Sequence, residues 1–232
     1  MVKKLVTRVL TPLLFIVATS LCTLAATDLA ILHRKIISTS DKSDSYLISK
    51  YDNIFQEVGE RYGLDWLLLS AIAYSESEFK PTAISKVGAI GIMQIMPSVA
   101  KNMGYEREAL FDVEVCAEVA AKLLHENNKM LRLSSSFDKK ERLRFILACY
   151  NAGYSRIADA RRLANFNNEN SNDWSVVATY LEKLAEPEFY NHEVVVSGDF
   201  YGSKETITYV KKVMRIYNRY RNTYHLSTLT TP

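Results

Sequence analysis

The sequence lacks the clusters of cysteine and histidine that hold metal ions. It contains 3 cysteines and 4 histidines among its 232 residues. The histidines are scattered along the chain at His33, His125, His192 and His225. No spacing between these side chains matches that of a metal site, so we expect no metal.

Cysteine pairs that could cross-link the chain are also few. Cys116 and Cys149 fall on predicted helices, and outside the cytoplasm they could form a disulfide. Two buried free thiols are the reading that we favour, because cysteine is commonly an ordinary core residue. A lipid anchor on Cys22 is disfavoured by the bulky side chain of Leu21 before it.

A large net charge is absent once the N-terminus is set aside. Lys3, Lys4 and Arg8 precede residues 9–26, which are largely apolar and carry no charge. This pattern predicts a signal peptide or a signal anchor over residues 1–26. Without these three residues, 26 of the 29 basic residues remain, and they balance the 26 acidic residues. We therefore expect no nucleic-acid partner.

Strand patterns are scarce, whereas helical patterns follow one another along the chain. Residues 27–50 are polar and predict a tether, and residues 51–225 predict one folded domain that is all-α. Helices are expected near residues 51–62, 65–79, 112–131, 138–150, 155–165, 173–185 and 204–222. Gly88 and Gly91 mark residues 83–96 as a loop or a small hairpin.

One carboxylate stands where an apolar side chain is expected. On a helix that is capped by Asp65, the period of about 100° per residue places Glu76 beside four apolar residues: Leu69, Ile72, Ala73 and Phe79. Ser70, Tyr74 and Ser77 mark the other side, and Glu78 points away from Glu76. An apolar environment raises the pKa of a carboxyl group, as a general acid requires. On position alone, a glutamate that reaches water or pairs with an arginine is the alternative.

Four separated segments share their residues with one known family. They are Glu76-Ser77 with Phe79-Lys80-Pro81 and Ala83-Ile84-Ser85, then Gly88-Ala89-Ile90-Gly91-Ile92-Met93-Gln94-Ile95-Met96-Pro97, then Cys149-Tyr150-Asn151-Ala152-Gly153, and finally Glu205-Thr206-Ile207-Thr208-Tyr209-Val210. In this order they resemble the motifs of the soluble-lytic-transglycosylase catalytic domain, and most closely the module of the membrane-bound type F. The chain departs from the pattern at Ile92, Cys149 and Val99, and Val99 lacks a hydroxyl that is common at its position.

The resemblance implies a lysozyme-like, α-rich fold with a small loop or hairpin element beside the cleft. It also implies an enzyme of the cell envelope or periplasm that cleaves the MurNAc–GlcNAc β-1,4 bond of peptidoglycan strands and leaves 1,6-anhydro ends. Glu76 would act first as acid and then as base, which needs no second carboxylate. We expect no cofactor and a monomer, and association with the membrane through the N-terminal segment stays open.

The resemblance further implies eight residues that bind the glycan or hold the glutamate. These are Ser77, Ser85, Met93, Gln94, Met96, Tyr150, Asn151 and Tyr209. Structural roles are the alternatives: turn glycines at Gly88 and Gly91, methionines as core filler, Tyr150 as a core aromatic and Asn151 as the end of a helix. At the level of function, the alternatives are a hydrolytic muramidase on the same fold and a catalytically silent glycan-binding protein.

Overall fold

Helices make up nearly all of the regular structure in residues 47–230, which are the residues that the computed structural model describes. The predicted export segment 1–26 and nearly all of the predicted tether 27–50 lie outside this range. The elements are α2 (Asp52–Tyr62), α3 (Trp66–Ser77), α4 (Pro97–Asn102), the 3-10 helix η1 (Arg107–Phe111), α5 (Val113–Leu131), α6 (Lys139–Ala152), α7 (Tyr154–Phe166), α8 (Trp174–Lys183), α9 (Pro187–Tyr190) and α10 (Ser203–Thr230). The predicted all-α class is confirmed.

The predicted helix starts are found at the expected aspartates. Asp65 accepts a hydrogen bond from the Leu67 N–H at 3.0 Å, and Asp112 accepts one from Val115 at 2.9 Å. Asp138 caps α6 in the same way. Each such cap satisfies a backbone donor that the helix leaves unpaired and contributes about 1 kcal/mol. The short elements α4, η1 and α9 were not predicted. None of the helices that the structure describes is both long enough and apolar enough to cross a membrane.

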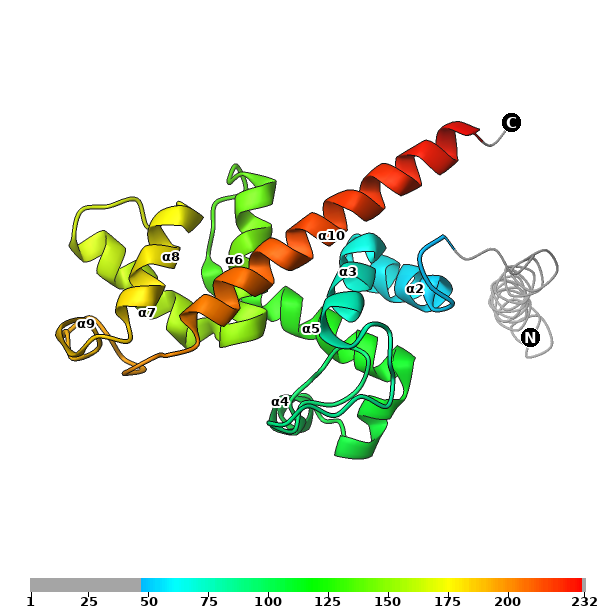
Figure 1. Ribbon diagram of the computed structural model, residues 1–232, viewed down its shortest axis with the longest axis horizontal. Coiled ribbons are helices and arrows are strands. Elements are labelled where there is room, and N and C mark those ends of the chain that lie inside the picture. The colour runs from blue at the N-terminus through cyan, green and yellow to red at the C-terminus, as the bar shows by residue number, and fades with distance from the viewer. Residues whose placement is uncertain (1–46, 231–232) are drawn as a thin grey trace, which may run out of the picture. The chain divides into compact units, whose positions relative to one another are not determined.

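The helix α3 lies at the centre of the domain. The long helix α10 packs along both α3 and α6, as its diagonal course in Figure 1 shows, and α2 covers another side of α3. The expected division of α3 into an apolar and a polar side is therefore wrong. Ser70 is 0% exposed and Ser77 is 8% exposed, because neighbouring helices enclose α3 almost completely.

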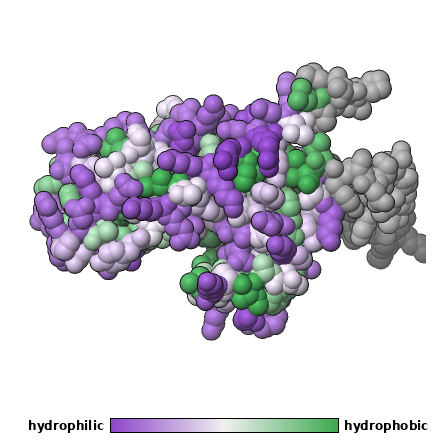
Figure 2. All heavy atoms as spheres, in the orientation of Figure 1, coloured by the Kyte–Doolittle hydropathy of each residue, from purple (hydrophilic) through white to green (hydrophobic). Residues whose placement is uncertain are grey.

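The segment between α3 and α4 is a folded loop with two isolated antiparallel bridges. Ile90 pairs with Ile84 on one side and with Ile95 on the other. In Figure 1 this loop and α4 form a lobe at the bottom, beside η1 and part of α5. Figure 2 shows apolar side chains gathered on that lobe, where the apolar residues with large exposure include Ile84, Val87 and Met96.

Gly91 fastens this loop against the rest of the domain. Its N–H donates to the Ala83 carbonyl at 2.9 Å, and its φ of 79° lies in the left-handed region. A Cβ atom at this position would lie 2.1 Å from the Leu110 carbonyl oxygen and 2.9 Å from the Cys116 sulfur. Only glycine therefore allows the loop to approach η1 and α5 this closely.

Gly91→Ala should strongly destabilise the domain, because it adds a backbone clash to the strain of a positive φ. Gly88→Ala is the matched control, since Gly88 has a φ of 89° and an added Cβ would meet nothing within 4 Å. We expect a loss of roughly 1–2 kcal/mol in unfolding free energy for the control and about 4 kcal/mol or more for Gly91→Ala. Urea denaturation measures both, and equal losses would show that the close approach is unimportant.

Candidate active site

Glu76 lies in the last turn of α3, where the chain leaves the helix sharply. Glu78 and Phe79 both have positive φ, at 52° and 62°, and they turn the backbone away from the helix axis. The Glu78 side chain is 67% exposed and pairs with Lys80 at 3.2 Å. Glu76 itself is half-buried. The two acids therefore face different environments, as expected, although the left-handed turn at Glu78 and not the helical period separates them.

Burial raises the pKa of Glu76 to about 7. Tyr209 and the Lys212 ammonium act in the opposite direction, while the negative charge of Glu205 raises the pKa further. The predicted rise is thus confirmed, and its main cause is the loss of hydration of the carboxylate. A carboxyl group with such a pKa holds a proton in part of its molecules at neutral pH, and it can both donate and accept one.

Two tyrosines face Glu76 from different helices. The Tyr150 hydroxyl, on α6, donates to the Met93 carbonyl at 2.8 Å. The Tyr209 hydroxyl, on α10, is buried and makes no hydrogen bond of ordinary geometry to a described residue, although it lies near enough to lower the pKa of Glu76. Burial, followed by the charge of Glu76, raises the pKa of both phenols well above 10, so both stay neutral.

One stripe of α10 lies toward the end of α3. Glu205, Tyr209 and Lys212 are spaced by four and three residues, which places them on one face of a helix. Lys212 Nζ donates to the Ser75 carbonyl at 2.8 Å. Sequence reasoning missed Glu205 and Lys212 as neighbours of Glu76, although their helical spacing from Tyr209 was a signal that could have identified them.

Asn151 connects α6 to the start of the same long helix. Its side-chain oxygen accepts a hydrogen bond from the Thr206 hydroxyl at 2.8 Å. Asn151 is exposed in the last turn of α6, just before Gly153, whose φ is 84°. The third and fourth sequence motifs therefore meet in space at this contact.

Ser77 and Met93 are buried instead of facing solvent. The Ser77 hydroxyl donates to the Ile92 carbonyl at 2.8 Å and accepts from the Lys80 N–H at 3.0 Å, so it joins α3 to the loop. Met93 is 0% exposed. Its side chain fills the core, which is the structural alternative noted for the methionines. Its carbonyl accepts the hydrogen bond from the Tyr150 hydroxyl.

Ser85, Gln94 and Met96 lie on the loop with part of each side chain accessible. The Ser85 hydroxyl accepts from the Ala89 N–H at 2.9 Å. The Gln94 amide nitrogen donates to the Gly91 carbonyl at 2.9 Å and to Ala83 at 3.2 Å. Its amide oxygen has no hydrogen-bond partner among the described residues, and Met96 is 39% exposed. The loop thus fixes Gln94 while leaving one acceptor available.

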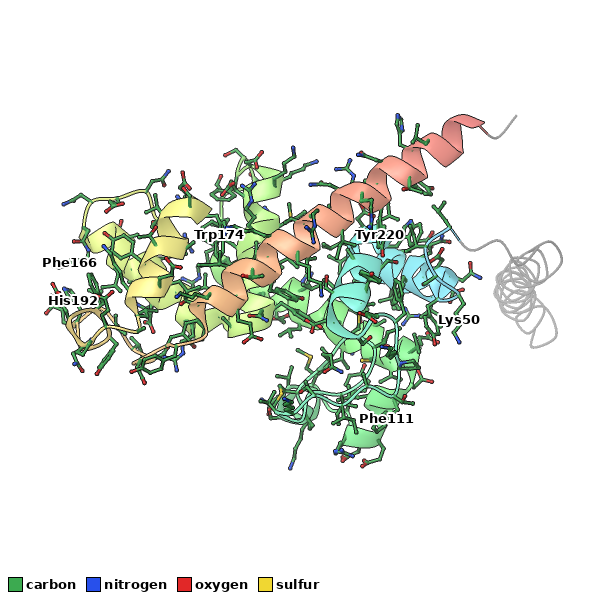
Figure 3. The ribbon with its side chains drawn as sticks, in the orientation of Figure 1. Lys50, Phe111, Phe166, Trp174, His192 and Tyr220 are labelled. Atoms are coloured by element: carbon green, nitrogen blue, oxygen red, sulfur yellow. The ribbon has the colours of Figure 1, made fainter. Side chains whose placement is uncertain are left out.

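The cysteines and histidines that the structure describes contribute no metal-binding group to this arrangement. Cys116 and Cys149 are free and buried, as we favoured, and burial raises their thiol pKa values to about 11 and about 12. His192 packs on Phe166 with ring centroids 4.4 Å apart, at the end of the molecule away from α3 in Figure 3. Among the described residues no group of acidic, histidine and cysteine side chains could hold a metal ion.

Comparisons with known proteins agree with these motifs. The family model described as "Transglycosylase SLT domain" matches residues 53–173. The chain is similar to "Membrane-bound lytic murein transglycosylase F 1" of Alkalilimnicola ehrlichii, with 31% identity over 175 residues that cover 73% of this chain and 33% of the relative. The protein named "Membrane-bound lytic murein transglycosylase F" in Haemophilus influenzae is 33% identical over 173 residues, which cover 74% of this chain and 34% of that protein. The chain therefore spans about a third of the length of these curated relatives.

Solved structures show the same fold. The 70 kDa soluble lytic transglycosylase of Escherichia coli superposes with a TM-score of 0.52 at 23% identity, covering 74% of this chain and 24% of that one. An inactive mutant of the lytic transglycosylase Slt from Pseudomonas aeruginosa also gives a TM-score of 0.52, at 19% identity, with coverage of 75% and 25%. The expected lysozyme-like fold is confirmed by these neighbours. Since the family model matches more than half of the sequence, the chain belongs to the transglycosylase SLT domain family.

Proposed function

We propose that this protein is a lytic transglycosylase that cleaves the β-1,4 bond between MurNAc and GlcNAc in peptidoglycan. The observation that carries the proposal is Glu76, a half-buried carboxyl with a pKa near 7 between two neutral tyrosines. Family membership supports it, as do relatives that are themselves named lytic murein transglycosylases. A signal-bearing N-terminus would place the enzyme in the periplasm or cell envelope, and that location is part of the proposal.

In the proposed reaction Glu76 transfers one proton out and takes one proton back. The protonated carboxyl donates to the glycosidic oxygen, and the bond between that oxygen and C1 of MurNAc breaks. The carboxylate then accepts the proton of the C6 hydroxyl, whose oxygen bonds to C1 and closes the 1,6-anhydro ring. No water is consumed and Glu76 ends protonated, as it began. A pKa near neutrality suits both steps, because the same group must be protonated in part of the molecules at the start and must act as a base in the second step.

The surrounding residues divide into two groups by their accessibility. Gln94, with its available acceptor, is proposed to contact the sugar together with Ser85, Met96 and Asn151, which keep part of their surface accessible. Tyr150 and Tyr209 are proposed to hold Glu76, since tyrosine offers both a ring face and a hydroxyl. Ser77 and Met93 are proposed to act on the substrate indirectly, by fixing the loop that carries Gln94.

Hydrolysis on the same fold is the second candidate, and one observation favours it. Glu205 is an exposed carboxylate whose charge reaches Glu76, so it is a candidate for activating water. Hydrolytic glycosidases use two carboxylates in this way. The deciding experiment is mass spectrometry of muropeptides released from purified sacculi. Anhydro ends, lighter by one water than reducing ends, support transglycosylation, whereas reducing ends alone would make the protein a muramidase.

Glu76→Gln should abolish cleavage, because it keeps the size of the side chain and removes the transferable proton. General acid–base groups contribute about 10²- to 10⁴-fold, and a sole acid should reach the upper end of that range. Glu78→Gln is the control, since this exposed acid points elsewhere. Release of soluble muropeptides from sacculi measures both variants. Activity of Glu76→Gln within tenfold of the wild type would remove Glu76 from its proposed role, and loss in both variants would indicate damage to the helix end.

Glu76→Gln should also stabilise the domain at alkaline pH. The carboxyl has an ordinary pKa of 4.5 and a pKa of about 7 in the fold, so the folded state holds its proton more tightly. Stability is therefore lost as pH rises from about 4.5 through 7, and at pH 8 the buried charge costs up to about 3 kcal/mol. Urea denaturation should show equal stability of wild type and variant at pH 4 and a more stable variant at pH 8. A wild type that is at least as stable as the variant at pH 8 contradicts the raised pKa.

Tyr209→Phe should lower turnover with little loss of stability, because it removes only the hydroxyl beside Glu76. We propose that this hydroxyl bonds the Glu76 carboxylate during the reaction; a hydrogen bond to a charged group is worth about 1.5–3 kcal/mol, so we expect a decrease of about tenfold to about a hundredfold. Tyr209→Ala should lower the melting temperature as well, since it deletes a buried ring. Turnover and thermal unfolding of both variants give the answer. Unchanged turnover in Tyr209→Phe would assign this residue to the core alone.

A further inference from the structure

Lys212 lies beside the proposed acid, and the reaction described above makes no use of it. It is half-buried on α10, one turn after Tyr209. Its ammonium donates to the carbonyl of Ser75, the residue directly before Glu76, at 2.8 Å. The salt bridges found among the described residues do not include Lys212. Its charge is thus not neutralised by an acid in direct contact.

The Ser75 carbonyl needs a partner because α3 ends there. The last four carbonyls of a helix have no partner within the helix. Here the Glu78 N–H donates to the Tyr74 carbonyl, the Phe79 N–H to Ala73 and the Lys80 N–H to Ser77. These bonds leave the Ser75 carbonyl to Lys212. A cation at the C-terminus of a helix also interacts favourably with the helix dipole. Lys212 therefore fixes the turn from which the Glu76 side chain extends.

The electrostatic environment of Glu76 contains few groups that carry charge. In the part of the chain that the structure describes, five titratable side chains act on Glu76 or respond to it: Glu205, Tyr209 and Lys212 from α10, Tyr150 from α6 and Cys116 from α5. The phenols and the thiol stay neutral at physiological pH. Among residues 47–230, Lys212 and Glu205 are therefore the charged groups that act on the carboxyl, and Lys212 is the one that favours its ionised form.

We propose that Lys212 is a positioning residue for Glu76, holding the last turn of α3 through the Ser75 carbonyl. Its ammonium in addition favours the ionised carboxylate. The inference rests on the proposed function, because the first step of that reaction needs the protonated Glu76 carboxyl and the second step needs the ionised carboxylate. A carboxyl held protonated too strongly would be a weak acid toward the glycosidic oxygen. The position of the carboxylate would also vary if the helix end were released.

The test compares Lys212→Gln with Lys211→Gln. Lys211 is the neighbouring residue, is exposed, and its replacement changes the net charge of the protein equally. Turnover on sacculi is measured from pH 4 to pH 9. We expect Lys212→Gln to lower turnover at pH 5 several-fold and to move the alkaline fall of activity up by roughly one pH unit, since loss of a nearby cation raises a carboxyl pKa. Lys211→Gln should match the wild type, and Lys212→Arg should restore most of the activity.

A second measurement separates this inference from the proposed function. A ¹³C NMR titration of the Glu76 carboxyl reports its pKa without turnover, and it should rise in Lys212→Gln and in Lys212→Met. If sacculi are not cleaved by the wild type but this pKa shift is found, the proposed function fails while the positioning role stands. If all variants titrate alike, or if Lys212 replacements lower only the melting temperature, Lys212 is a structural anchor and the inference is wrong.

Discussion

The packing of α10 against the end of α3 is the contact on which the candidate site depends. It buries Glu76 enough to shift its pKa, places Tyr209 beside it and supplies Lys212 to a carbonyl that the helix leaves unpaired. The same helix starts at the Thr206–Asn151 hydrogen bond, which ties it to the end of α6. Burial of the carboxyl and support of its backbone thus come from one interface.

The loop between α3 and α4 is also fixed in place by specific contacts. Gly91 brings it within contact of the Leu110 carbonyl and the Cys116 sulfur, and Ser77 links it back to α3. Gln94 has a φ of 50°, an uncommon value for a residue other than glycine, and its own amide group satisfies two loop carbonyls. Such a loop presents its remaining acceptor in one orientation in advance, so little ordering would be needed to bind the glycan of the proposed function.

The helices and the acid could be predicted from sequence because their signals are local. Asp65, Asp112 and Asp138 cap helices as their positions indicate, and Glu76 stands out from its apolar neighbours within one helix. The enclosure of α3 could not be predicted, because Ser70 and Ser77 look like a solvent-facing side until α2 and α10 are placed around them. Met93 shows the same limit, since a methionine in a motif gives no sign of whether its side chain or only its carbonyl matters. The spacing of three residues from Tyr209 places Lys212 on the same helix face, but its contact with Ser75 could not be predicted, because the partner is a backbone carbonyl.

The contact between Lys212 and Ser75 joins residues that are 137 positions apart. Closing a loop of this length has an entropic cost that other contacts must offset. A chain that is still being synthesised therefore contains Glu76 long before it contains α10, whose side chains shift the pKa of Glu76. The carboxyl acquires its neighbours Tyr209 and Lys212 only when the last helix docks, so incomplete or truncated chains carry the motif without this environment.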